Sequence, residues 1–169
     1  MRIAAFFSTI AATSVLAFAA QAAPLAPVAE VNVTIGAELQ DKADQYGQRE
    51  LDYLARDLRE SVIQAINRRG GLVPSGGTLD LVIEDAVPNR PTMRQMSKTP
   101  GLSFESFGIG GARVSGVLKT ADGQTLPVSY RWYESDIRWS ISAGTWSDAQ
   151  TTFDRFGRRL ADGSLVSER

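Results

Sequence analysis

A single helix-forming stripe places the strongest constraint on how this chain can fold. Within residues 47–69 the apolar side chains recur at i, i+3 and i+4, which predicts a long helix with one buried face. Arg68 and Arg69 suit the negative end of such a helix, and Gly70 and Gly71 predict its end. The buried face consists of Leu51, Leu54, Ala55, Leu58, Val62, Ala65 and Ile66.

The segments on either side of this helix alternate apolar and polar residues. Alternation with a period of two is typical of a half-buried strand, so we expect one strand before the helix and one after it. Pro88 ends the second of these strands. The alternating apolar residues are Val31, Val33 and Ile35 in the first segment and Leu79, Leu81 and Ile83 in the second.

Two further strands, at residues 112–120 and 125–134, flank the sequence TADGQ and predict a hairpin. We expect a three-residue loop with Gly123 in the left-handed region, which pairs Leu118 with Leu126. This register gathers the apolar residues on one face, whereas a slip of one residue would scatter them. It also sets Arg113 directly opposite Arg131.

The last helix is expected to begin near Trp146, with Thr145 as its N-cap and Asp148 as a short capping-box partner. The order is then β-α-β-(long loop)-β-β-α, which predicts a two-layer α+β domain: a four-stranded sheet with two helices on one face. Gly163 follows the last helix. The buried face of that helix consists of Ala149, Phe153, Phe156 and Leu160.

The first residues predict export. Met1 and Arg2 form a short positive start, residues 3–20 carry no charge, and residues 20–22 read Ala-Gln-Ala, a small-x-small cleavage site. We expect a signal peptide over residues 1–22, a tether over 23–29, one domain over 30–162 and a flexible tail over 163–169. The expected location is the periplasm or the exterior, with no membrane span after cleavage, and a retained anchor is the alternative.

The composition excludes several chemistries. The chain has no cysteine and no histidine, which excludes disulfides, thiol nucleophiles, histidine-based triads and the usual zinc sites. Loss of Arg2 with the leader takes the net charge from −1 to −2, so nothing favours a nucleic-acid partner. The glycines at 108, 110 and 111 fit no phosphate-binding motif. We therefore expect no catalytic residue, no metal and no cofactor.

The long stretch at residues 88–111 is the first candidate binding region. Arg90, Arg94 and Lys98 recur at four-residue steps, with no acidic residue before Glu105, which suits an anionic partner. The same residues predict at least one helical turn, with Pro91 at its start.

The apolar residues of this stretch, Phe104, Phe107 and Ile109, argue against full disorder and predict an ordered cover over part of the sheet. Both a plain connection and a surface for a ligand or partner remain open.

Arg113, Arg131 and Tyr133 form the second candidate binding region. Two opposed arginines repel each other, so an acidic group should lie between them. Glu134 and Asp136 are near in sequence and are one candidate, and an anion or a partner carboxylate held beside Tyr133 is the other. Glu84 and Asp85 are adjacent in a strand and are expected to point to opposite faces.

The sequence SFGIGGA, followed by YRWYESD, resembles small exported bacterial proteins of unknown function with the order β-α-β-β-β-α. The resemblance implies export and the fold, and it implies no activity and no site residue. We therefore expect an exported, non-catalytic domain that binds an envelope protein or an anionic ligand. The alternative is an envelope hydrolase that uses carboxylates.

Overall fold

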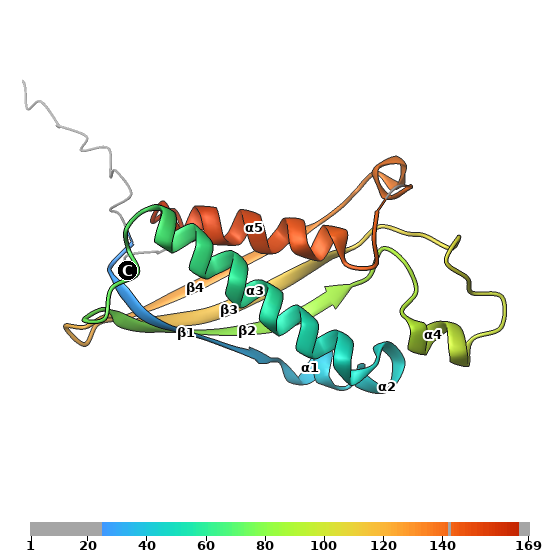
Figure 1. Cartoon of the computed structure of the whole chain (residues 1–169), viewed down its shortest axis with the longest axis horizontal. Coiled ribbons are helices and arrows are strands. Elements are labelled where there is room, and N and C mark those ends of the chain that lie inside the picture. The colour runs from blue at the N-terminus through green and yellow to red at the C-terminus, as the bar shows by residue number, and fades with distance from the viewer. Residues whose placement is uncertain (1–24, 142, 166–169) are drawn as a thin grey trace, which may run out of the picture.

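The computed structural model describes residues 25–141 and 143–165, which form a four-stranded sheet with two long helices on one face (Figure 1). The spatial order is β1-β2-β3-β4, and only β1 and β2 run parallel. The predicted α+β architecture is therefore confirmed. The strands are β1 (Val28–Ile35), β2 (Gly77–Val87), β3 (Gly111–Lys119) and β4 (Thr125–Tyr133).

The two long helices are α3 (Gln48–Arg68) and α5 (Ser147–Ala161), and both bury the predicted stripes. Every member of the α3 stripe is buried except Ala55, which is half-buried. Leu58 of α3 and Phe153 of α5 are fully buried in the one apolar core between the helices and the sheet. Burial of side chains of this size stabilises the fold by about 1.5–3 kcal/mol each.

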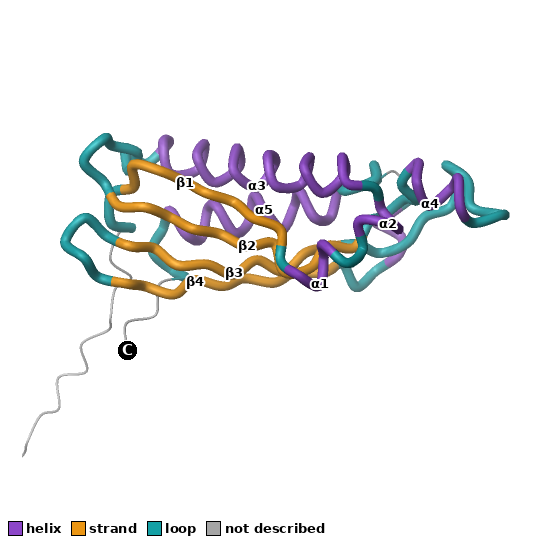
Figure 2. Tube along the Cα trace, turned by 90° about the horizontal axis from the view of Figure 1, so that it is seen from below, coloured by secondary structure: helices purple, strands orange, loops and turns teal. Residues whose placement is uncertain are grey.

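Four short helices complete the part of the chain that the structure describes. They are α1 (Ala37–Gln40), α2 (Ala43–Tyr46), α4 (Met93–Lys98) and the 3-10 helix η1 (Ile137–Ser140). The helical turn predicted in the long stretch is α4, but it begins at Met93 because Thr92, and not Pro91, caps it in a capping box with Gln95. Figure 2 views the uncovered face of the sheet, and α1 and α2 lie at the end of that face.

The predicted hairpin register is confirmed. Leu118 pairs with Leu126 and Arg113 pairs with Arg131, across a loop in which Gly123 has a φ of 86°. The left-handed conformation carries no steric penalty at glycine, so this residue permits the three-residue loop.

The ends of the domain differ from the predicted limits. β1 begins at Val28, which is fully buried, so the last residues of the predicted tether belong to the sheet. After α5, Gly163 and Ser164 donate backbone hydrogen bonds to Leu160 and Arg159, and the predicted tail thus begins as an ordered turn. The predicted signal peptide and its cleavage site lie outside the described residues. Within the described ranges, every helix is too short or too polar to span a bilayer.

Candidate functional site

A buried polar junction fixes the loops at one end of the sheet. Asn89, two residues after the end of β2, donates a side-chain hydrogen bond to the Asp148 carboxylate and accepts one from the Asp148 backbone N–H at 2.9 Å. The same carboxylate accepts the Gly110 N–H at 2.9 Å, and the Asn89 N–H donates to the Thr145 carbonyl. These contacts join the start of α5 to both ends of the long stretch.

The junction explains why one predicted cap is wrong. The residue at the N-cap of α5 is Trp146, whose own side chain makes no capping hydrogen bond, and the Asn89 side chain accepts the Asp148 N–H of the first turn instead. Thr145 contributes its backbone carbonyl to Asn89, while Asp148 turns toward the long stretch. A carboxylate in the first turn of a helix is favoured by the helix dipole, so Asp148 stabilises α5 without a capping box. Local spacing alone did not reveal its distant partners.

Arg90 is the clamp between the long stretch and the loop after β4. Its guanidinium donates to the carbonyls of Phe104, Ile141 and Ala143, each at 2.6 Å, and lies 5.8 Å from the centre of the Phe107 ring. The prediction placed Arg90 in a basic surface without local partners. Instead, each of its three guanidinium nitrogens donates a hydrogen bond within the chain, because a planar guanidinium can bind several carbonyls at once.

Arg94 and Lys98 also have partners that the sequence did not show. Both donate to the backbone carbonyl of Asp44 in α2, at 3.3 and 2.8 Å. The Arg94 guanidinium also lies 3.9 Å from the Asp44 carboxylate, in an exposed pair. The three cations of the predicted basic surface are therefore divided between two places. Arg90 lies at the loop clamp, and the other two fasten α4 to α2.

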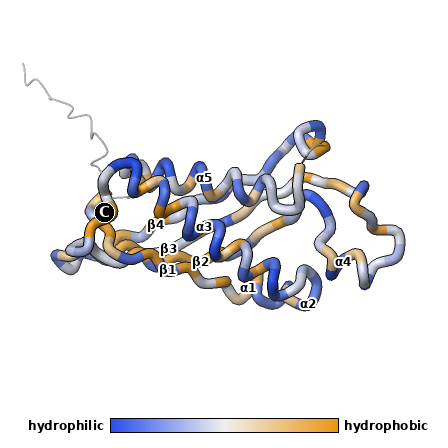
Figure 3. The backbone as a smooth tube through the Cα atoms, in the orientation of Figure 1, coloured by the Kyte–Doolittle hydropathy of each residue, from blue (hydrophilic) through white to orange (hydrophobic). Residues whose placement is uncertain are grey.

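Besides Met93 of α4, six large apolar side chains are exposed on these two loops, and we call these six the apolar loop end. Trp139 is 74 % exposed and Phe104 is 63 % exposed. Figure 3 shows apolar residues at the tip of the loop after β4, and the long stretch extends beyond the end of the sheet in Figure 1. The predicted cover over the sheet is therefore wrong. The apolar loop end consists of Phe104, Phe107, Ile109, Ile137, Trp139 and Ile141.

Arg113, Arg131 and Tyr133 lie together on the face of the sheet opposite α3 and α5, here called the open face. Arg113 forms an exposed ion pair at 2.8 Å with Glu38 of α1. Arg131 has no ion pair with any residue that the structure describes. The repulsion between the two opposed arginines is therefore offset by an acidic partner at Arg113 only.

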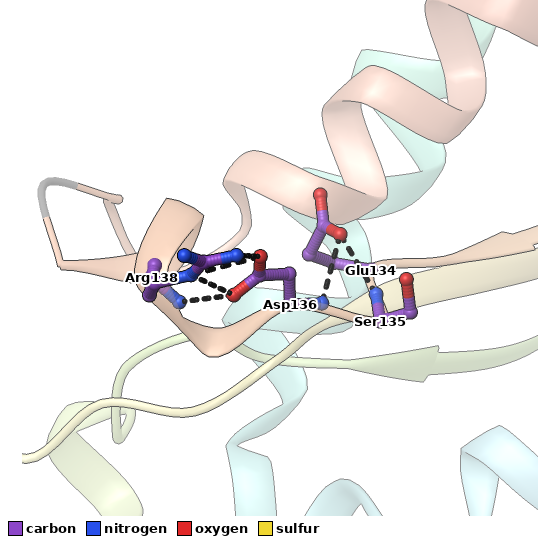
Figure 4. Close-up of polar contacts among 4 residues, drawn as sticks. All are labelled: Glu134, Ser135, Asp136 and Arg138. Atoms are coloured by element: carbon purple, nitrogen blue, oxygen red, sulfur yellow. Dashed lines mark hydrogen bonds and ion pairs between the residues drawn. The ribbon is translucent and has the colours of Figure 1, made fainter.

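The acidic residues expected to bridge the two arginines are used elsewhere. Figure 4 shows Glu134 accepting the backbone N–H groups of Ser135 and Asp136, at 2.8 and 3.0 Å, and Asp136 paired with Arg138. β4 ends at Tyr133, so these carboxylates belong to the following turn and not to the open face. The acidic partner of Arg113 comes instead from α1, which is far away in the sequence.

Glu84 and Asp85 share the open face, contrary to the prediction. A β-bulge in β2 lies between Ile83 and Asp85, and the extra residue breaks the alternation of side chains. The Glu84 carboxylate accepts the Ser115 hydroxyl. The Asp85 carboxylate accepts Lys42 Nζ and the Tyr133 hydroxyl, each at 2.7 Å.

The pKa values of Asp85 and Tyr133 are both shifted from their ordinary values. Burial alone would raise the pKa of Asp85, but the hydrogen bonds from Lys42 and Tyr133 and the positive charge of Lys42 hold it below its ordinary value. Burial and the bond to Asp85 raise the pKa of the Tyr133 phenol well above its usual range. Tyr133 is therefore a permanent hydrogen-bond donor at neutral pH and not a base.

The carboxylates of the described chain do not form a metal-binding group. Within residues 25–141 and 143–165, no three acidic side chains come together as a cation site. Glu84 and Asp85 are held by a hydroxyl, an ammonium and a phenol.

Comparison with protein-family models and with curated protein sequences finds no match.

Proposed function

We propose that this protein is an exported, non-catalytic domain that binds a partner protein of the cell envelope through its apolar loop end. The single observation that carries the proposal is the set of large apolar side chains exposed on two loops that are held together internally. Exposed apolar patches of this kind mark interaction surfaces more often than chance exposure does. Trp and Phe are also enriched at protein interfaces, and Trp is a frequent hot-spot residue there.

The loops are ordered before any partner binds, which supports binding as their role. Arg90 bonds to backbone carbonyls of both loops, and Asn89 and Asp148 bind the base of both. A preordered surface loses less conformational entropy when a partner binds, so more of the contact energy appears as affinity. The contacts of Asp148 with Asn89 and Gly110 are buried, and a plain connection would not require them.

Export rests on the leader pattern of residues 1–22 and on the resemblance to small exported proteins. The absence of cysteine suits a domain held by its apolar core alone. The hydrolase alternative has less support, since Glu84 and Asp85 lie on an open sheet face with engaged oxygens. Binding of an anion between Arg113 and Arg131 is a second candidate, because Arg131 lacks an acidic partner among the described residues.

Site-specific photo-crosslinking in living cells tests the proposal. A crosslinking amino acid at Trp139 should give a discrete protein adduct, and the same group at Gln124, in the hairpin turn at the other end of the sheet, should give none. Changing Phe104 and Ile141 to Ser should abolish the adduct at 139 while the melting temperature stays close to that of wild type. Equal adducts at positions 139 and 124, or an adduct unaffected by the Ser changes, would contradict binding at the apolar loop end.

A further inference from the structure

A groove of about 490 Å³ lies between the first half of α3 and the start of α5. Arg49, Tyr53 and Arg56 line it from α3, and Trp146 and Gln150 line it from the other side. The three α3 residues follow one another at four- and three-residue steps, so they lie on one side of the helix. The groove shares no residue with the apolar loop end and none with the open face.

The two arginines of the groove have no acidic partner among residues 25–141 and 143–165. Arg56 lies over the Tyr53 ring, 5.5 Å from its centre. Asp52, one turn before Arg56, accepts a hydrogen bond from Gln48 instead. The guanidinium groups therefore keep donors for an external acceptor.

The one carboxylate that lines the groove is engaged. Glu50 Oε2 accepts the indole N–H of Trp146 at 2.7 Å. Trp146 in turn packs edge-on against Tyr46, with ring centres 5.6 Å apart. These contacts fix the Trp146 ring in the wall of the groove. The groove is lined by two arginines and one carboxylate, so it has more positive than negative side chains.

A second groove, of about 630 Å³, adjoins the first and shares Arg49 and Glu50 with it. It continues past Tyr46 toward α4, where Met93 is 67 % exposed. The two grooves together form a depression around the start of α3. Its charged lining consists of three guanidinium groups, Arg49, Arg56 and Arg94, and two carboxylates, Glu50 and Asp44. Asp44 lies 3.9 Å from Arg94, and Met93 adds an exposed apolar side chain.

We propose that this depression binds an extended acidic peptide segment of a partner protein. Its carboxylates would accept hydrogen bonds from Arg49 and Arg56, since guanidinium groups bind carboxylates in a two-point geometry. An apolar side chain of the same segment would lie against Met93 and Tyr46. The proposal rests on this depression and does not depend on what the apolar loop end binds.

The probe is a blocked peptide that repeats Glu-Glu-Leu, titrated into the purified protein by calorimetry at low salt. We expect saturable binding that weakens by about tenfold in the double variant Arg49→Gln and Arg56→Gln, because two charge-assisted contacts are lost. Arg68→Gln is the matched control, since Arg68 lies at the other end of the same helix and lines a different groove. Its affinity should change by less than about twofold.

The NMR signal of the Trp146 indole N–H gives an independent readout of where the peptide binds, and it should shift during the titration of wild type. Binding of a Gln-Gln-Leu peptide with equal affinity would overturn the proposal. So would equal weakening by Arg68→Gln, or an indole signal that does not move. Failure of the crosslinking at Trp139 would leave this result unchanged, so the two proposals fail separately.

Discussion

Asn89 and Asp148 are 59 residues apart in the chain and bind each other twice, side chain to side chain and side chain to backbone. Asn89 is 1 % exposed and Asp148 is 9 % exposed. Both loops of the apolar loop end begin or end within a few residues of this pair. The pair therefore connects the fold of the core to the shape of the proposed binding surface.

Asn89→Ala should lower the free energy of unfolding by about 3 kcal/mol, because a buried carboxylate loses a donor and a backbone N–H loses its acceptor. Urea unfolding followed by circular dichroism measures the effect. Thr145→Ala is the control, since the Thr145 hydroxyl caps nothing, and it should cost less than about 0.5 kcal/mol. A larger loss in Thr145→Ala than in Asn89→Ala would contradict the roles assigned to these residues.

Arg90→Gln should loosen the two loops with little effect on the core, because the three carbonyls that it binds belong to those loops. Amide hydrogen exchange should become at least about tenfold faster at residues 102–109 while β2 and α3 stay protected. The double variant Arg94→Gln and Lys98→Gln is the control for Arg90→Gln, because it removes only exposed contacts with Asp44. Unchanged exchange at residues 102–109 in Arg90→Gln would show that the clamp is dispensable.

Leu58→Asp and Phe153→Asp should each unfold the domain. Both side chains are fully buried between the helices and the sheet, and an unpaired carboxylate there costs several kcal/mol, which is comparable to the whole stability of a small domain. Gln64→Asp places the same group on the exposed side of α3 and should keep a cooperative melting transition. Cooperative melting of either core variant near the wild-type temperature would mean that its stripe faces solvent.

Asp85→Asn should destabilise the protein by about 1–2 kcal/mol at pH 7, since Lys42 and Tyr133 then bind a neutral group. The pKa of Asp85 lies below its ordinary value of 3.8 in the folded protein, so its contribution is present above that pH and is lost as the pH falls through the folded value. The stability difference between wild type and variant should therefore be constant from pH 5 to 7 and shrink below about pH 4. A difference that grows on acidification would contradict the assignment.

Arg131→Gln should leave stability unchanged or raise it by a few tenths of a kcal/mol, because it removes the repulsion with Arg113. Arg113→Gln should cost less than about 1 kcal/mol, since its pair with Glu38 is exposed. If the two arginines bind an anion, sulfate should raise the melting temperature of wild type more than that of Arg131→Gln. Equal shifts of the melting temperature in the two proteins would contradict an anion site at these arginines.

Much of the fold follows from local patterns. The α3 stripe, the strands and the β3–β4 register were all predicted, because side-chain period and turn geometry act over a few residues. In the hairpin, the left-handed Gly123 and the need to place Val114 and Val128 on the buried face are compatible with one register only. The predicted opposition of Arg113 and Arg131 was confirmed for the same reason.

The polar contacts of the candidate sites could not be predicted in this way. Lys42 and Asp85 are 43 residues apart, and Arg113 and Glu38 are 75 apart. A charged side chain on an exposed surface can pair with several partners at similar energies. Which partner it finds therefore depends on where the fold places the short helices. The bulge that turns Glu84 and Asp85 to one face is likewise set by pairing with β3.

The sequence by itself determined the helical and strand periodicity of the chain, the buried stripes of α3 and α5 and the hairpin register, because burial of apolar area and turn geometry outweigh most alternatives locally. It did not reveal the core residues Val28 and Leu39, which lie outside those patterns. Only the tertiary structure decided which loops meet. Asn89 finds Asp148, and Arg90 finds three carbonyls, because the packing of α5 on the sheet brings those loops to one end. Buried polar groups require partners, and the packed fold alone supplies them at hydrogen-bonding distance.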